Sequence, residues 1–437
     1  MTPLPAQAPD RFEAATYRKI TLHLMPFLFL CYALAYVNRV NVSFAYLQMQ
    51  ADLGMSSEVY GFGAGLFFVG YFFLNVPSNM LLKRIGARGL LGPILILRGI
   101  LSAWMMFVHG ATSYCVLRFI GGAVEAGFFP GVVFYLTFWY TNKYRAKMIA
   151  LFMSAIPISA IFAGPLAGSI LKHLQGVAGL AGWQWLYLIF GIPLSVAGVI
   201  ALFVMTNDPE QAAWLSADEK KLVSGGLQAE HEADKRAGGA KSRLVDAFAS
   251  GAVWLLCLVY FGISAANYCI GFYMPKVIKD SISKDTVVIG WLYAIPWVVT
   301  TVVMLLVGRH SDRTGERRWH LALCCFGAAL GFAILSLPGI PGAVSLAGLT
   351  LATASVLSAF TMFWAVPTAL LAGTAAAAGI AWINAVGNLG GYAGPHATGA
   401  IVDHTGSMML AWLALAGVML TSALVTLYVT RKGALRR

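Results

Sequence analysis

The chain has 437 residues, of which 59% are hydrophobic and only 11% are charged, and its formal net charge is +12. Soluble globular proteins carry about 25% charged residues, so this composition excludes an ordinary soluble domain and predicts a polytopic protein of the lipid bilayer. The basic residues gather at the ends of apolar runs, so the positive charge reflects membrane topology and gives no reason to expect nucleic acid as a partner.

Apolar runs of roughly 20 residues are long enough to cross a bilayer as helices, and the chain has about twelve of them. They predict an all-α fold with membrane spans near 20–44, 58–82, 89–109, 112–138, 148–172, 183–206, 251–275, 286–307, 319–338, 342–371, 376–402 and 408–430. Residues 1–19 are polar and the first apolar run is long, so we expect no cleavable signal peptide.

Lys and Arg fall mainly at alternate connections between the predicted spans. They cluster before the first span, after the second, fourth and eighth spans, in the central linker and after the last span. Cytoplasmic loops are enriched in these residues, so both termini are expected in the cytoplasm. Lys276, Lys279 and Lys284 are the main exception, because they would lie on the outer side.

Residues 207–250 are rich in charge and have almost no apolar periodicity, which predicts a cytoplasmic linker between two six-helix bundles, residues 1–206 and 251–437. The bundles echo one another, because the basic, glycine-containing turns at 83–88 and 308–318 occupy corresponding places. Internal repeats are typical of transporters, whose binding site lies near the bilayer midplane between the repeats.

Arg118 and Glu125 are the only charged side chains in the stretch 114–138. They are two helical turns apart, so they share one face and lie roughly 10 Å apart along the axis. Arg39 lies deep in the first span, after an apolar run. Ionisable groups at bilayer depth usually face a protein-lined or watery cavity, so this cavity is the place to expect function.

These residue types suggest separate roles. Arg binds a carboxylate through two parallel hydrogen bonds, so Arg39 is expected to bind the carboxylate of a substrate, although a permanent partner for Arg39 is the alternative. Burial raises the pKa of a carboxyl group and a nearby Arg lowers it, so protonation of Glu125 can respond to its surroundings. Glu125 is therefore the expected proton carrier, with Arg118 as its internal partner. Glu125 would otherwise only neutralise Arg118.

Arg98 lies near the centre of the third predicted span. It could snorkel at the periphery, contact another helix, or face the cavity as an additional anion contact. The remaining polar lining is expected from six residues: Tyr36, Tyr71, Asn267, Tyr268, Asn384 and Asn388. A few polar groups in an apolar, aromatic lining suit a small organic anion. Helix packing and interhelical hydrogen bonds are the alternatives, and His396 is interpreted as a core group more than as a titrating one.

Chemistry at a metal or a nucleophile is not indicated. The six cysteines all fall in spans without a C-x-x-C pair or a matching histidine spacing, which favours small core residues over a metal site. Neither G-x-S-x-G nor H-E-x-x-H is present. We therefore expect no enzymatic activity, no catalytic residues and no cofactor.

Several motifs together resemble the major facilitator superfamily, and within it the anion:cation symporters that include tartrate, phthalate, hexuronate and galactonate permeases. They are YVNRVN at 36–41, VPSN at 76–79 with GAR at 86–88, EAGFFPG at 125–131, DPEQAAWLS at 208–216, GRHSDRTGERR at 308–318 and GNLGG at 387–391. The resemblance implies twelve helices in two pseudo-symmetric bundles, a bacterial inner membrane and a monomer. It also implies proton-coupled import of a small organic anion such as tartrate, an aromatic acid or a sugar acid.

An exchanger or exporter of organic anions is the main alternative, and a transceptor without net flux is a further one. The chain also departs from the pattern of many relatives, which carry an acid just before the Arg of the first span where this chain has Asn38. Acids found in relatives are also absent at Asn75, Lys83 and Phe190. Glu125 is therefore the one clear titrating group of the first half, and a two-proton stoichiometry is in doubt.

Overall fold

The computed structural model describes residues 8–236, 250–370 and 374–432. Within these residues the regular structure is entirely helical, which confirms the predicted all-α class. The first half contains α1 (Ala8–Asp52), α2 (Ser57–Trp104), α3 (Ala111–Glu125), α4 (Phe128–Thr137), α5 (Asn142–Met153), α6 (Ala155–His173) and α7 (Gly182–Val204). The second half contains α10 (Gly251–Ser281), α11 (Thr286–Thr314), α12 (Arg318–Leu335), α13 (Gly342–Phe363), α14 (Ala365–Leu370), α15 (Thr374–Asn388), α16 (Gly390–Thr405) and α17 (Met409–Val429).

Eleven helical segments of the described residues are long and apolar enough to cross a membrane. The predicted span at 376–402 corresponds to α15 and α16, two shorter helices that meet at Leu389. α2 contains both the second and the third predicted spans. Gly86 separates them with a left-handed φ of 75°, and the Asn207 side chain accepts a hydrogen bond from the backbone N–H of Arg88 at 3.1 Å across this turn.

The fourth predicted span is not continuous. It breaks between α3 and α4, directly after Glu125. Pro130 explains the break, because proline has no N–H to donate to the carbonyl oxygen of Ala126 four residues earlier. The Asn75 amide lies 3.5 Å from that oxygen and supplies a donor from α2. The break therefore places Glu125 at the end of a helix, inside the bundle.

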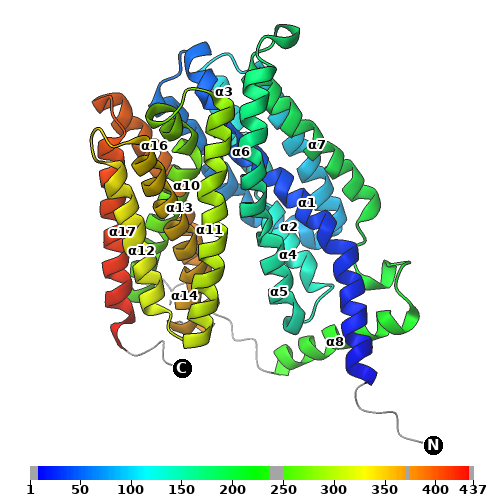
Figure 1. Cartoon of the computed structure of the whole chain (residues 1–437). Coiled ribbons are helices and arrows are strands. Elements are labelled where there is room, and N and C mark those ends of the chain that lie inside the picture. Colours follow the sequence, from blue (N-terminus) through cyan, green and yellow to red (C-terminus); the bar gives the residue numbers. More distant parts are fainter. Residues whose placement is uncertain (1–7, 237–249, 371–373, 433–437) are drawn as a thin grey trace, which may run out of the picture.

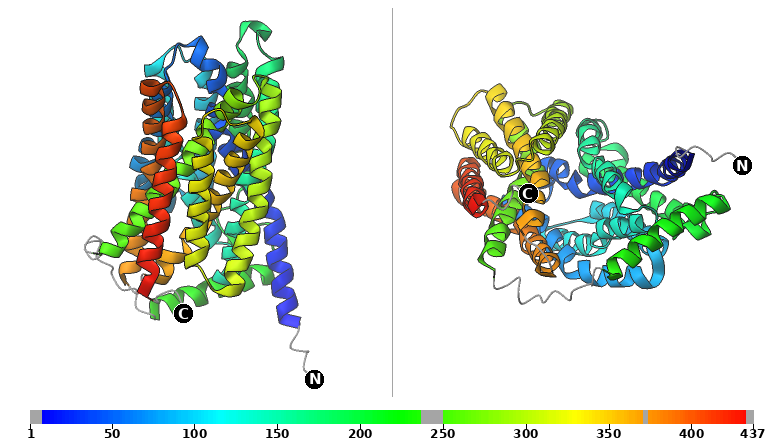
Figure 2. Two further views of the ribbon diagram at one scale, coloured as in Figure 1. Left: turned by 60° about the vertical axis from the view of Figure 1, so that its left-hand side comes forward. Right: turned by 90° about the horizontal axis from the view of Figure 1, so that it is seen from below.

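The predicted linker contains a helix that the sequence did not indicate, α8 (Ala217–Arg236). Its acids bind the first half: Glu219 pairs with Lys19 of α1 at 2.8 Å, and Glu230 pairs with Arg145 of α5 at 3.2 Å. Glu230 also accepts a hydrogen bond from the backbone N–H of Asn142, the first residue of α5. α8 therefore lies across the ends of α1 and α5 (Figure 1 and Figure 2).

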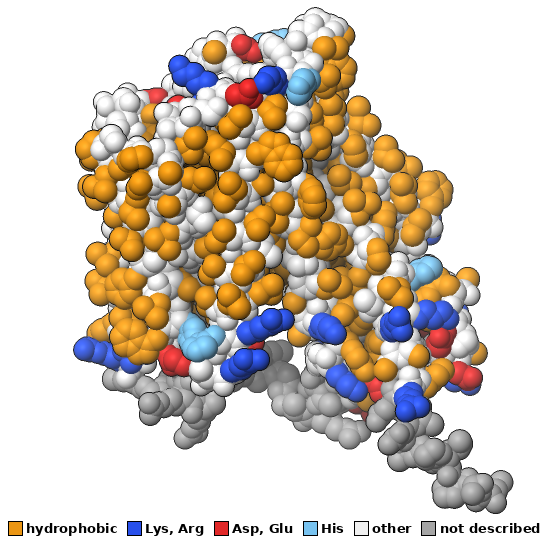
Figure 3. All heavy atoms as spheres, in the orientation of Figure 1, with side chains coloured by type: hydrophobic (Ala, Val, Ile, Leu, Met, Phe, Trp, Pro, Cys, Tyr) orange, Lys and Arg blue, Asp and Glu red, His pale blue; other side chains and the backbone are white. Residues whose placement is uncertain are grey.

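The helices form two bundles that stand side by side, α1–α7 and α10–α17 (Figure 1 and Figure 2). We call the end at which α1 begins and α17 ends the lower end, and the opposite one the upper end. Apolar side chains cover the visible flank between the two ends, and Lys and Arg gather near the lower rim (Figure 3). This surface is that of a multi-pass membrane protein.

The two bundles meet mainly in their upper parts, where α2 packs on α16, α6 on α11 and α1 on α10. Several contacts are between backbones: a Cβ on Gly164 would overlap the carbonyl oxygen of Gly290, and one on Gly399 would overlap that of Ser57. In the lower part α15 barely touches α2, and α4 and α5 pack extensively only on helices of their own bundle. The structure is thus closed at its upper end.

Candidate substrate and coupling site

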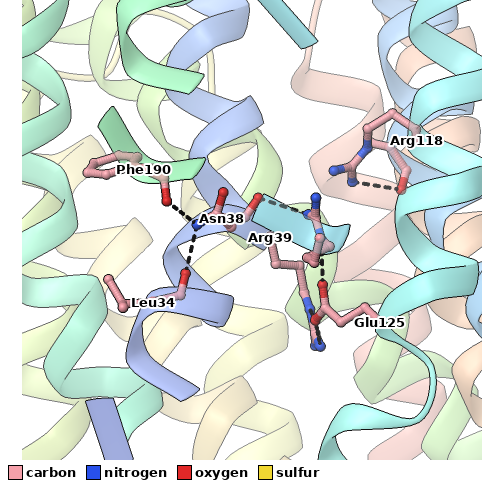
Figure 4. A network of polar contacts seen from close by, with 8 residues as sticks. Leu34, Asn38, Arg39, Arg118, Glu125 and Phe190 are labelled. Atoms are coloured by element: carbon pink, nitrogen blue, oxygen red, sulfur yellow. Dashed lines mark hydrogen bonds and ion pairs between the residues drawn. The ribbon is translucent and has the colours of Figure 1, made fainter. Parts of the chain in front are cut away.

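Two guanidinium groups hold the carboxylate of Glu125. Arg39 of α1 donates its Nε to Oε1 at 2.9 Å and contacts the same oxygen with Nη2 (Figure 4). Arg98 of α2 donates its Nε to Oε2 at 2.9 Å. Glu125 is 1% exposed. We call Arg39, Arg98 and Glu125 the ion triad.

Local packing explains how three helices bring these side chains together. A Cβ on Gly122 would overlap the backbone carbonyl of Phe67, so glycine allows α3 to approach α2 to backbone contact one turn before Glu125. The helix break at Ala126 then leaves the acid at the end of α3. The sequence predicted the depth of Arg39 and Glu125 and left open a permanent partner for Arg39, a helix end or an acid, but it did not identify Glu125 as that partner.

Arg98 is buried inside the first bundle. One of the three predictions for it, that its side chain snorkels at the periphery, is therefore wrong. Its side chain is 6% exposed, and Nη2 donates to the carbonyl oxygen of Asn38 at 3.1 Å. The Asn38 amide donates in turn to the carbonyl oxygens of Leu34, at 3.0 Å, and Phe190, at 2.6 Å. Asn38 thus joins α1 to α7 through its side chain and accepts a hydrogen bond from Arg98 with its backbone carbonyl.

Arg118 does not pair with Glu125, and that prediction is wrong. Its Nη2 donates to the carbonyl oxygen of Ala64 at 3.3 Å, and its guanidinium lies over the rings of Phe67 and Phe272, 5.0 and 5.7 Å from their centroids. Arg118 and Glu125 are two helical turns apart along α3. The guanidinium groups of Arg39 and Arg98, from α1 and α2, lie closer to the Glu125 carboxylate and pair with it instead. Arg118 has no ion-pair partner among the described residues.

The site carries an excess of positive charge. Arg98, Arg118 and Glu125 are the charged residues among the buried side chains of the described chain, and Arg39, 13% exposed, lies beside them. Three guanidinium groups and one carboxylate leave a formal excess of two positive charges. Such a site, away from bulk water, favours an anion.

Phe67 of α2 is a residue that the sequence interpretation missed. All three guanidinium groups lie over its ring: Arg39 at 5.5 Å, Arg98 at 5.6 Å and Arg118 at 5.0 Å from the centroid. The negative face of an aromatic ring stabilises a nearby cation. The ring of the predicted Tyr71 lies 6.0 Å from the guanidinium of Arg39. Phe67 precedes Tyr71 by one helical turn and so shares its helical face, which is the sequence feature that could have indicated Phe67.

The second bundle contributes Tyr268 of α10 to the surroundings of the ion triad. Its hydroxyl lies close enough to interact electrostatically with Arg39 and Glu125, and its ring packs on Phe68 of α2 with 4.1 Å between centroids. Asn267, beside it on α10, is half-buried. Tyr268 therefore brings α10 next to the ion triad.

The other predicted lining residues lie farther from the carboxylate. Tyr36 of α1 meets the edge of Trp297 of α11, with centroids 6.3 Å apart, so it lies between the bundles. The Asn388 amide donates to Asn384 at 3.2 Å, and Asn384 is exposed. Gly391, at the start of α16, packs on Phe68 of α2, so the bundles are in contact directly after these asparagines.

His396 packs between aromatic rings in the upper part of α16. Its ring centroid lies 5.3 Å from that of Phe62 and 5.7 Å from that of Tyr392, away from the ion triad. No group of three or more His, Cys, Asp or Glu among the described residues could hold a metal ion. The guanidinium groups around Glu125 are suited to binding an anion.

Comparisons with known proteins show the family of the chain. A family model described as Major Facilitator Superfamily matches residues 28–395 and again 256–436. A "Putative tartrate transporter" of Agrobacterium vitis is 43% identical over 423 residues, which are 96% of this chain and 95% of the relative. A "Putative metabolite transport protein NicT" of Pseudomonas putida is 40% identical over 97% of this chain and 96% of its own length.

Solved structures share the fold at low sequence identity. The inward-open xylose transporter XylE from E. coli superimposes with a TM-score of 0.74 at 15% identity, over 93% of this chain and 95% of that protein. The two six-helix bundles seen here therefore have the arrangement of a known transporter fold.

Proposed function

Because the chain belongs to the major facilitator superfamily, we propose that this membrane transporter imports a small organic anion together with protons by alternating access. Its relatives are transporters and not enzymes. The cargo, the coupling ion and the direction of transport are the proposed parts. The cargo class is a carboxylate such as tartrate, an aromatic acid or a sugar acid, and the working unit is a monomer.

The observation that carries the proposal is the charge around Arg39. Its guanidinium is the most exposed of the three in the site, and it is held by the carboxylate of Glu125. A cargo carboxylate would make the same kind of charge-assisted bonds to Arg39. Glu125 therefore occupies a position that an anionic cargo can compete for.

In the proposed cycle, a proton taken up by Glu125 cancels the negative charge that holds Arg39. Arg39 then binds the cargo carboxylate through two parallel hydrogen bonds, which the single ammonium of Lys cannot reproduce. The cargo charge is thereby compensated before the bundles rock, which matters because an unpaired charge is costly in a low-dielectric barrier. Tyr268 and Asn388, from the second bundle, would contact the cargo from the opposite side.

We assign the lower end to the cytoplasm of a bacterial cell, with both termini there and the chain in the inner membrane. The Lys and Arg near the lower rim support this orientation. In this orientation the structure is closed toward the outside. The state is then the one from which cargo is released inward.

An anion exchanger is the second candidate, and Arg98 is the observation that favours it. Arg98 holds the oxygen of Glu125 that Arg39 leaves unpaired. A carboxylate whose two oxygens are both paired has less to gain from a proton. The cargo would then be exchanged for a second anion.

Uptake of labelled carboxylates into proteoliposomes separates the two candidates. We expect the protein to accumulate one acid, tartrate first among those to try, when the pH gradient is directed inward. Glu125→Gln should lose accumulation and keep counterflow of labelled against unlabelled acid. Glu210→Gln, which changes an exposed acid outside the site, is the matched control and should keep both.

Full accumulation by Glu125→Gln would show that Glu125 does not couple protons to transport. Uptake that ignores the pH gradient and requires a preloaded anion would establish the exchanger.

A further inference from the structure

A small polar pocket lies beside the ion triad, toward the upper end of the first bundle. Its polar lining comes from Asn38 and Asn41 of α1, Arg98 and Ser102 of α2, and Arg118 of α3. Its interior has room for about one water molecule. The function proposed above does not use this pocket.

Five polar atoms of the lining are buried without a hydrogen-bond partner among the described protein atoms. The donors are Nε of Arg118, Nδ2 of Asn41 and Oγ of Ser102, and the acceptors are Oδ1 of Asn38 and Oδ1 of Asn41. A buried polar atom without a partner is costly, because the water that it gave up on folding is not replaced by another hydrogen bond. Five such atoms around one cavity therefore indicate a ligand.

The orientation of Asn38 restricts what that ligand is. The Asn38 amide nitrogen donates to the carbonyl oxygens of Leu34 and Phe190, so the network fixes which side of the amide faces the pocket. An acceptor oxygen faces the pocket from Asn38, while a guanidinium N–H faces it from Arg118. The ligand must both donate and accept, which water does and a halide ion does not.

We propose that ordered water occupies this pocket and that it is the link between Arg118 and the ion triad. Arg118 has no direct contact with Glu125, but it shares the pocket with Arg98 and Asn38. Arg98 binds both the Glu125 carboxylate and the backbone of Asn38. Water in the pocket solvates the Arg118 guanidinium and connects it, through these two residues, to the acid.

Hydroxyl-radical footprinting of the purified protein tests the proposal directly, because radicals form at bound water and oxidise side chains beside it. Met105 and Tyr187 line the pocket and are 4% and 2% exposed. We expect both to be oxidised several-fold faster than Met25 and Met419, which are 2% and 0% exposed and lie away from the pocket. Equal slow oxidation of all four would overturn the proposal.

Asn41→Leu distinguishes pocket water from water that reaches Met105 by another route. Leucine keeps the size of asparagine but removes both of its polar atoms, so oxidation of Met105 and Tyr187 should fall to the level of Met419. Unchanged oxidation would contradict the proposal. Ser102→Ala should partly decrease the oxidation of Met105 and Tyr187. Ser264→Ala is the control, because Ser264 lies outside the pocket and its buried hydroxyl also has no hydrogen-bond partner among the described residues; it should leave the oxidation unchanged.

Crystals grown in bromide test the competing ligand. Water predicts no anomalous signal in the pocket, and a bromide peak between Arg98 and Arg118 would overturn the water assignment in favour of a halide site. Neither measurement depends on transport. A chain that fails to couple anion uptake to protons could still show the water, so the two proposals fail separately.

Discussion

Arg98 and Glu125 form a 2.9 Å ion pair between Nε and Oε2 that is closed to solvent on both sides, with side chains 6% and 2% exposed. Arg98 also binds the backbone of Asn38, so it fixes the carboxylate against α1 and α2 while Arg39 holds the other oxygen. Arg98 thus orients the Glu125 carboxylate, whereas the side chain of Arg39 is more exposed to solvent than that of Arg98.

Removing one partner of this buried pair should be strongly destabilising. We expect Arg98→Met to lower the free energy of unfolding by about 3–5 kcal/mol, because an acid with one guanidinium fewer remains buried. Glu125→Gln should also destabilise, and the double variant should cost clearly less than the sum of the two. Thermal unfolding in detergent measures the three variants, and strictly additive losses would show that the two side chains are not coupled.

Arg39→Lys tests whether two parallel hydrogen bonds to the cargo matter. Lysine keeps the charge but presents a single ammonium group, so we expect binding of a labelled carboxylate to weaken by about tenfold or more. Arg145→Lys is the matched control, since Arg145 pairs with Glu230 at the lower end and lies outside the site. Equal affinity in both variants would remove Arg39 from the binding site.

Asp403 of α16 closes the upper end by accepting hydrogen bonds from the first residues of α2. Its Oδ1 accepts from the N–H of Ser57 at 2.9 Å, and its Oδ2 accepts from that of Glu58 at 2.7 Å. We expect Asp403→Asn to lengthen the separation of spin labels placed at Val177 and Lys284, on opposite bundles. Asp280→Asn, which alters a pair within α10, is the control and should leave the separation unchanged.

The closure by Asp403 should not respond to pH in the physiological range. Burial acts to raise the pKa of Asp403, but the backbone N–H of Glu58 and further bonds from Ser56 and Ser57 outweigh it, so the pKa lies below its ordinary value of 3.8. A carboxylate with a lowered pKa contributes its stabilisation above the ordinary value and loses it only as the pH falls through the lowered one. The same label separation should therefore stay constant from about pH 8 to about pH 5. A change within that range would assign the closure to another group.

Gly122→Ala tests the backbone contact that positions Glu125. The added methyl group would overlap the carbonyl of Phe67, so we expect a loss of about 1–3 kcal/mol in stability and weaker cargo binding. Gly417→Ala in α17 is the matched control, because a Cβ there has open space around it. It should be neutral or slightly stabilising, since alanine favours helix by up to about 1 kcal/mol.

The sequence predicted the class of the fold because hydropathy alone reports membrane spans. It also predicted which charged residues lie at depth, since an Arg or Glu inside an apolar run is conspicuous without any structure. It did not predict the pairing. Helical spacing relates Arg118 to Glu125 within α3. Glu125 instead pairs with Arg39 of α1 and Arg98 of α2. Distances between different helices cannot be read from the residue spacing within one helix.

Two other features also lay beyond sequence reasoning. α8 has few apolar residues, of which Val223 is buried in the core of the first half. Its ion pairs with Lys19 and Arg145 leave no periodic pattern in the sequence. Phe67 is one aromatic residue among many in α2, and its role depends on three guanidinium groups that converge on it from different helices. Both features depend on tertiary contacts.

The glycine contacts at the upper end bear on how fast the protein can work. Where Gly164 meets Gly290, and Gly399 meets Ser57, one main chain rests on another, so the bundles approach to backbone contact at these points. Aromatic rings also cross the interface, such as Tyr36 against Trp297 and Phe68 against Tyr268, and these rings must separate when the upper end opens. The activation barrier for opening should therefore depend on the polar bonds of Asp403 together with these aromatic contacts, and the turnover rate should respond to changes at either.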